Sequence, residues 1–188
     1  MLQKHTRPSR SSSAATTAHH QQKPLPGFAY SRAFFEELVD SALAHAKKLG
    51  TSDAGAEASE GSGLSVSVRK GALENVERNR DKSLGVTVYL GNRRGNASTS
   101  DFSPAAIERT VQAAYDIARF TAQDLFAALP DEADIARGPA PDLDLFHPWA
   151  IDSEQAAELA LRCEAAALQR DARISNSEGA AVSTQQSH

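Results

Sequence analysis

The regular alternation of apolar and polar residues in residues 63–101 constrains the fold of this chain most strongly. Within this segment, apolar side chains recur at every second position over residues 64–69 and again over residues 84–90. A period of two places all the apolar side chains of a strand on one face. Both stretches therefore predict half-buried β-strands with one face on a core.

Strand and turn signals alternate throughout residues 54–100. The turns are expected at the EGSG sequence (60–63), at Lys70 and Gly71, and at residues 91–95. Hairpin spacing without intervening helices favours antiparallel pairing. We predict short strands at residues 54–59, 64–69, 73–78, 83–90 and 96–100.

Two amphipathic helices bracket these strands. One is expected over residues 31–50, with Ser31 as its cap, and the other over residues 103–120, where Ser103 and Pro104 are typical of a helix start. Their apolar residues follow helical spacing. We therefore predict an α+β fold, a twisted antiparallel sheet with amphipathic helices on one face.

A third helix is expected after a capping-box sequence formed by Asp152 and Gln155. We assign its buried face to Ala156, Leu159, Ala160, Cys163 and Ala167. The predicted organisation is a disordered basic Ser/Thr/His-rich tail (1–30), an α+β domain (31–120), a Pro/Asp-rich connection (121–151), this helix (152–172) and the start of a truncated domain (173–188). A strand begun after residue 173 would have no partner in the remaining chain.

Charge is distributed unevenly along the sequence. Five of the 20 Lys and Arg residues, but none of the 24 Asp and Glu residues, lie in residues 1–35, so the remainder has a formal net charge of −9. Binding to a phosphate backbone needs clustered basic side chains, so we expect no direct nucleic-acid binding. No apolar run is long enough for a membrane span, and a single cysteine fits a reducing compartment, so we expect a cytoplasmic protein.

Four segments in one order closely resemble the N-terminal part of the PmbA (TldE) branch of the TldD/PmbA family, over about residues 34–179. They are SVSVRKGALENVERNRDKSLGVTVYLGNRRGNASTSD, SPAAIERTVQAAYDIARF, APDLDLFHP and RISNSEG. The resemblance implies a two-subunit metallopeptidase in which TldD-type subunits carry zinc in an HExxxH arrangement and PmbA-type subunits lack a complete metal site. It also implies a large C-terminal β-rich domain, so we expect this chain to be an N-terminal fragment.

No residue of this chain is assigned a catalytic, cofactor-binding or metal-binding role. A zinc peptidase needs histidines about one helical turn apart and a carboxylate, and none of the six histidines has a partner at such spacing. His147 could hydrogen-bond Asp142 or Asp144, and we interpret it as a loop residue. Cys163 falls on the expected buried face of the third helix and is interpreted as a core residue.

The basic cluster expected in the folded part comprises Arg69, Lys70, Arg78, Arg80, Arg93 and Arg94. The candidate contact surface within it is Arg69, Lys70, Arg93 and Arg94. It has two interpretations: a surface that helps to hold an extended peptide or partner against an open sheet edge, or a solvated sheet face. In the second case the basic side chains pair with Glu74, Glu77 and Asp81.

Two functional hypotheses follow. The first is a non-catalytic part of a PmbA/TldE-type subunit that works with a TldD-type partner, whose zinc activates water for proteolysis of unfolded or leader peptides. The second is a stand-alone domain that binds a protein or nucleic acid without a peptidase partner. Co-purification with a TldD-type chain separates the two.

Overall fold

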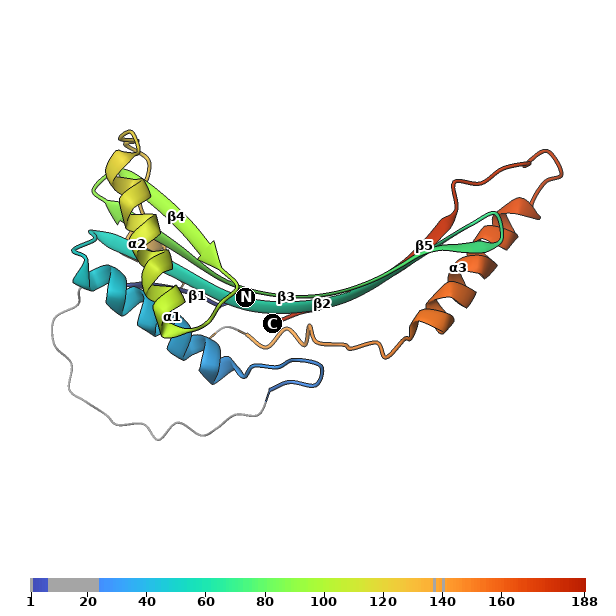
Figure 1. Ribbon diagram of the computed structural model, residues 1–188, viewed down its shortest axis with the longest axis horizontal. Coiled ribbons are helices and arrows are strands. Elements are labelled where there is room, and N and C mark those ends of the chain that lie inside the picture. Colours follow the sequence, from blue (N-terminus) through green and yellow to red (C-terminus); the bar gives the residue numbers. More distant parts are fainter. Residues whose placement is uncertain (1, 7–23, 137, 140) are drawn as a thin grey trace. The chain divides into compact units, whose positions relative to one another are not determined.

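Two long strands, β2 (Asp53–Arg69) and β3 (Ala72–Leu90), form the centre of an antiparallel sheet (Figure 1). The computed structural model describes residues 2–6, 24–136, 138–139 and 141–188. The other described elements are β1 (Leu2–Thr6), α1 (Arg32–Lys48), β4 (Arg93–Thr99), α2 (Pro104–Phe120), the short 3-10 helix η1 (Glu132–Asp134), α3 (Ser153–Leu168) and β5 (Ala180–Ser187).

The strand order is β1-β2-β3-β4, and β5 also pairs with β2. Along β2, residues 54–58 pair with β1 and residues 61–68 pair with β5. On the other side of the sheet, β4 pairs antiparallel with residues 84–90 of β3. All of these pairings are antiparallel, which together with the helices confirms the predicted α+β class.

The chain divides into two compact units that share both long strands. Unit 1 contains Met1–Glu60, Lys82–Ala140 and His188, and unit 2 contains Gly61–Asp81 and Pro141–Ser187. Each unit has its own group of buried side chains. The linear domain boundaries predicted from composition stay a prediction.

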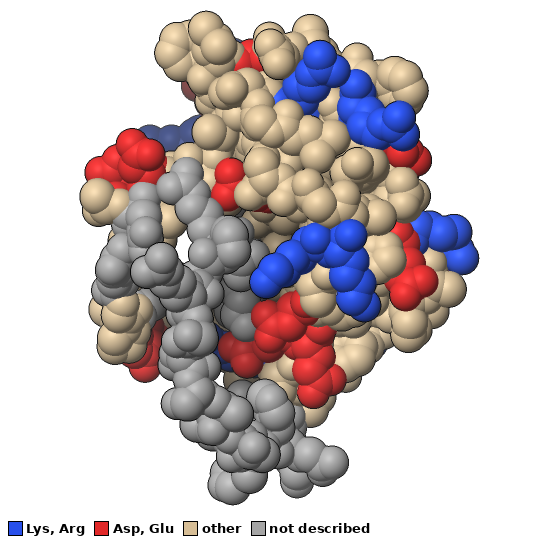
Figure 2. All heavy atoms as spheres, turned by 90° about the vertical axis from the view of Figure 1, so that its left-hand side faces the viewer, with Lys and Arg blue, Asp and Glu red and all other residues tan. Residues whose placement is uncertain are grey.

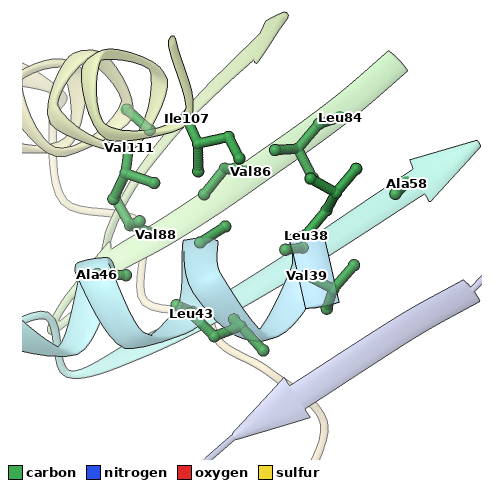
Figure 3. Close-up of a cluster of buried hydrophobic side chains, with 14 of the residues drawn as sticks. Leu38, Val39, Leu43, Ala46, Ala58, Leu84, Val86, Val88, Ile107 and Val111 are labelled. Atoms are coloured by element: carbon green, nitrogen blue, oxygen red, sulfur yellow. The ribbon is translucent and has the colours of Figure 1, made fainter. Parts of the chain in front are cut away.

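The core of unit 1 lies between the sheet and two helices (Figure 3). Alternate residues of β3, Leu84, Val86 and Val88, are at most 2% exposed, as the period of two predicts. Val39 of α1 and Val111 of α2 are fully buried in the same cluster, so both helices cover one face of the sheet. Burial of each such side chain stabilises the fold by roughly 1.5–3 kcal/mol.

The predicted helix starts are confirmed. Ser31 caps α1 by accepting a hydrogen bond from the amide of Phe34, and Ser103 caps α2 in the same way. Asp152 and Gln155 form both hydrogen bonds of a capping box at the start of α3. These side chains satisfy amides that have no partner within the helix.

Two turn and strand predictions are wrong. Residues 60–63, the EGSG sequence, lie inside β2, because pairing with β5 holds Gly61 and Gly63 in extended structure. Likewise, the strands predicted at 73–78 and 83–90 are parts of the single strand β3. Long-range pairing overrides the local turn preference of Gly and Ser.

The C-terminal segment also differs from expectation. Residues 180–187 form β5, which pairs with β2, so this strand does have a partner within the chain.

On α3, Cys163 is exposed while Glu164 is only 3% exposed, so the buried face runs through Ala156, Ala160 and Glu164. Apolarity alone could not identify a buried face that includes a carboxylate.

The N-terminal segment contributes a strand that composition did not predict. Leu2–Thr6 forms β1, and Phe28 is 8% exposed in the core. Both features lie in the tail predicted to be disordered (1–30), so the prediction differs from the structure at these described residues. Residues 1 and 7–23 of the tail, which include His19 and His20, lie outside the described residues.

Candidate functional site

The β2–β3 turn places two of the predicted contact residues at one end of unit 2. Lys70 and Gly71 have φ angles of 53° and 74°, the combination that a two-residue type I′ hairpin requires. The Glu164 carboxylate of α3 accepts hydrogen bonds from the amides of both residues at 2.9 Å. Thus the helix fixes the turn, while the Lys70 side chain stays exposed.

These contacts lower the pKa of the Glu164 carboxyl. The hydrogen bond from the Gly71 amide lowers the pKa of Glu164 most, and the Lys70 amide and the Ser177 hydroxyl lower it further against the opposing effect of burial. Because the ionised form accepts both amide hydrogen bonds, the turn is most stable when Glu164 is charged. Sequence reasoning missed this residue, since a glutamate within a helix carries no signal that it reaches a distant turn.

The other predicted contact residues lie elsewhere. Arg69 precedes the turn in unit 2, and its Nη2 lies 3.6 Å from Glu178 Oε2. Arg93 and Arg94 are the first two residues of β4 in unit 1. The Arg93 guanidinium donates a hydrogen bond to the carbonyl of Arg119 at 3.0 Å. Arg69 and Lys70 thus lie in unit 2, whereas Arg93 and Arg94 lie in unit 1. A shared peptide-binding role for these four side chains stays a prediction.

A group of exposed apolar side chains lies at the end of α2 and in the segment after it. Phe120 is 85% exposed and Phe126 is 94% exposed. We call this group the α2-end surface; it comprises Ile117, Phe120, Leu125 and Phe126. In Figure 2 the upper part of the face shown, where α2 ends, is mostly tan with basic groups beside it.

The segment that carries the α2-end surface is held by hydrogen bonds. The Asp124 amide donates to the carbonyl of Asn92 at 2.9 Å, and the Asn92 side chain donates to the carbonyl of Leu125 at 3.3 Å. The Phe126 amide donates to the Asp124 carboxylate. Large apolar side chains on a fixed segment are typical of a contact surface. The sequence does not identify this surface, because the Pro- and Asp-rich composition of residues 121–151 predicts only a connection.

The buried carboxylate of Glu60 holds the segment before α1. Glu60 is 4% exposed and accepts hydrogen bonds from the amides of Ala29 and Tyr30 at 2.7 and 3.1 Å. The His188 ring packs against Phe28, with ring centroids 5.2 Å apart, and burial lowers the pKa of His188. These contacts position the segment before α1 and provide no catalytic arrangement.

Within the described part of the chain, no group of three or more His, Cys, Asp or Glu side chains is placed to hold a metal ion. His147 Nε2 lies 3.9 Å from Asp144 Oδ2, and both side chains are largely exposed. Trp149, two residues after His147, is 59% exposed, so it does not anchor this loop in the core. None of the described helices has the length and apolar content that crossing a membrane requires.

Comparisons with known proteins give consistent results. Residues 56–118 match the family model described as PmbA/TldA metallopeptidase domain 1. The chain is 53% identical over 150 residues to "Metalloprotease PmbA" of Escherichia coli O157:H7, covering 79% of this chain and 32% of that protein. It is 46% identical over 153 residues to a PmbA homologue of Haemophilus influenzae, covering 79% and 34%.

A solved structure has the same fold. The structure of TldE from Thermococcus kodakarensis matches with a TM-score of 0.56 and 13% identity, over 79% of this chain and 36% of that chain. This chain therefore spans about a third of the length of the relatives that it matches.

Proposed function

Because this chain belongs to the TldD/PmbA family and corresponds to the N-terminal third of its PmbA relatives, we propose that it serves a PmbA/TldE-type subunit of a peptidase assembly. In this proposal the assembly works in the cytoplasm and hydrolyses unfolded or leader peptides. The observation that carries it is the 53% identity to Escherichia coli PmbA over 150 residues.

Peptide hydrolysis itself is assigned to the partner. The residues that the structure describes do not fit the zinc site that the family description implies, because they contain no set of three candidate ligands. We place the zinc in a TldD-type subunit, where it would activate water and polarise the peptide carbonyl. No step of the reaction is assigned to a residue of this chain.

The contribution of this chain is protein contact. The α2-end surface supports this role, because side chains such as Phe126 expose apolar area that burial against another protein surface would remove from water. The guanidinium of Arg119 lies over the Phe120 ring at 5.8 Å, so the surface combines apolar and basic groups. Aromatic and Arg side chains are enriched where protein surfaces bind.

Capture of a tagged chain tests the proposal. The chain is co-expressed with a TldD-type subunit and recovered through the tag, and we expect the TldD-type subunit to co-purify. Phe126→Ser is expected to reduce the recovery, whereas the matched control Leu143→Ser, on an exposed residue of unit 2, should not. A chain that captures no TldD-type subunit but binds DNA with strong salt dependence would favour the stand-alone binding domain instead.

A further inference from the structure

One edge of unit 2 is open. Residues 72–81 of β3 pair with β2 on one side, while β4 pairs only with residues 84–90. None of the strands that the structure describes covers the other side of residues 72–81. These ten residues are exposed on both faces of the strand, including Leu73 at 55% and Val76 at 43%.

The open edge lacks proline and lysine but carries five other charged side chains, Glu74, Glu77, Arg78, Arg80 and Asp81. Its sequence, ALENVERNRD, contains no proline and no lysine, and the structure keeps it in regular extended conformation. Natural proteins commonly protect long edge strands with such residues or with bulges. A second strand can therefore pair with the backbone of residues 73–79 if its charges complement those of Glu74 and Arg78.

The side chains along the edge are self-complementary. Glu74, Val76 and Arg78 are spaced by two residues, so they lie on the same face of the strand. In an antiparallel pair with a two-fold axis at Val76, Glu74 of each copy lies opposite Arg78 of the other. The two valines meet between these two opposite-charge pairs.

Neighbouring registers are less favourable. An axis at Glu77 pairs Glu74 with Arg80 but also places the two copies of Glu77 opposite each other. A shift by half a residue further pairs Glu77 with Arg78 but places Glu74 opposite Asp81. Like charges directly opposite in a sheet are destabilising. The charge pattern therefore selects the register centred on Val76.

We propose that two copies of this chain associate through residues 72–81 of β3, antiparallel and centred on Val76, to form a continuous sheet across the two copies. A closed two-fold pairing uses the same surface in both copies and leaves no open edge at this position. This inference rests on unit 2 alone and does not depend on the peptidase proposal.

Sedimentation equilibrium of the full 188-residue chain tests the pairing. We expect a monomer–dimer equilibrium whose Kd rises about 30-fold in Glu74→Arg and in Arg78→Glu, since each variant replaces two attractive pairs with two repulsive ones. Glu77→Arg is the matched control: it makes the same change of charge but lies opposite Asn75 of the second copy, so the Kd should stay within about twofold.

Mixing the two single variants gives the decisive result. A Glu74→Arg chain and an Arg78→Glu chain are complementary to each other, so an equimolar mixture should form a heterodimer about as tight as the wild-type dimer. This recovery also shows that both variants are folded. A chain that remains monomeric at all soluble concentrations, a dimer insensitive to both variants, or a mixture without recovery would overturn the proposal. So would protection of the amides of residues 72–81 only in the presence of an extended peptide or a TldD-type subunit.

Discussion

Replacement of Gly95 by alanine is expected to destabilise unit 1 strongly. Gly95 is buried in β4, opposite Val88 of β3, where the strand passes directly under α2. A Cβ atom at this position would lie 2.0 Å from the carbonyl oxygen of Ala114 and 2.5 Å from the amide nitrogen of Ala118. Both are backbone atoms, so no change of rotamer can relieve the contact.

The size of the effect follows from this geometry. Ordinary van der Waals contact begins at 3.4 Å, so α2 would have to move by about 1.4 Å away from the sheet. Such a shift loosens the packing of Val111 and Ala118, which are fully buried. Overpacking costs about 1–3 kcal/mol when side chains can adjust, and we expect about 3 kcal/mol here because backbone must move. For a chain of this size, that corresponds to a Tm lower by about 6–12 °C.

Thermal unfolding followed by far-UV circular dichroism measures the change, with Gly55→Ala as the matched control. Gly55 lies in β2 of the same unit, and a Cβ atom there has no neighbour within 4 Å. The control should melt within about 1 °C of the wild type, and hydrogen exchange in α2 should accelerate only in Gly95→Ala. Equal melting temperatures for the two variants would refute the close packing of α2 on β4.

Three further predictions concern the core, the β2–β3 turn and metal content. Val88→Asp should unfold unit 1, because it buries an unpaired charge. Arg93→Ala should leave the Tm within about 1 °C of the wild type. Similar Tm values for the two variants would contradict the assignment of Val88 to the buried face of β3. Since the folded-state pKa of Glu164 is lowered, its stabilising effect is present above the unfolded-state pKa of about 4.3 and is lost as pH falls through the lower folded-state value. The protection of the Lys70 and Gly71 amides against hydrogen exchange, taken relative to the intrinsic rate at each pH, should therefore fall in the wild type as the pH drops through the folded-state pKa of Glu164. It should depend less on pH in Glu164→Gln, and equal pH dependence of the protection would argue against the contact. The purified chain should retain no stoichiometric zinc after dialysis and cleave no casein; one tightly held zinc with chelator-sensitive cleavage would show that a ligand set has been overlooked.

Local patterns were sufficient to predict the elements that are stabilised locally. The period of two in residues 84–90, the caps Ser31 and Ser103 and the Lys70–Gly71 turn all have short-range causes, and the structure confirms each of them. The continuous course of β2 through residues 60–63 could not be predicted in this way, because its cause is pairing with β5, more than 100 residues away.

The candidate site was predictable only in part. The positions of Arg69, Lys70, Arg93 and Arg94 on turns and strand ends follow from the sequence, but their separation into two units depends on tertiary structure. Glu164 was missed because burial of a carboxylate requires hydrogen-bond donors that come from a distant turn. The α2-end surface was missed for a related reason, since exposure of an aromatic side chain depends on what packs beside it.

Peptide hydrolysis by a chimeric assembly tests the central claim most directly. In the chimera, residues 31–188 of this chain replace the corresponding N-terminal segment of Escherichia coli PmbA, to which the chain is 53% identical over 150 residues. The chimera is combined with a TldD-type subunit, and cleavage of an unfolded peptide is measured with and without a zinc chelator. Chelator-sensitive cleavage that requires both polypeptides is the predicted result. A folded chimera that leaves the TldD-type subunit inactive, although the complete Escherichia coli protein supports cleavage, would contradict the claim that this chain serves a PmbA/TldE-type subunit.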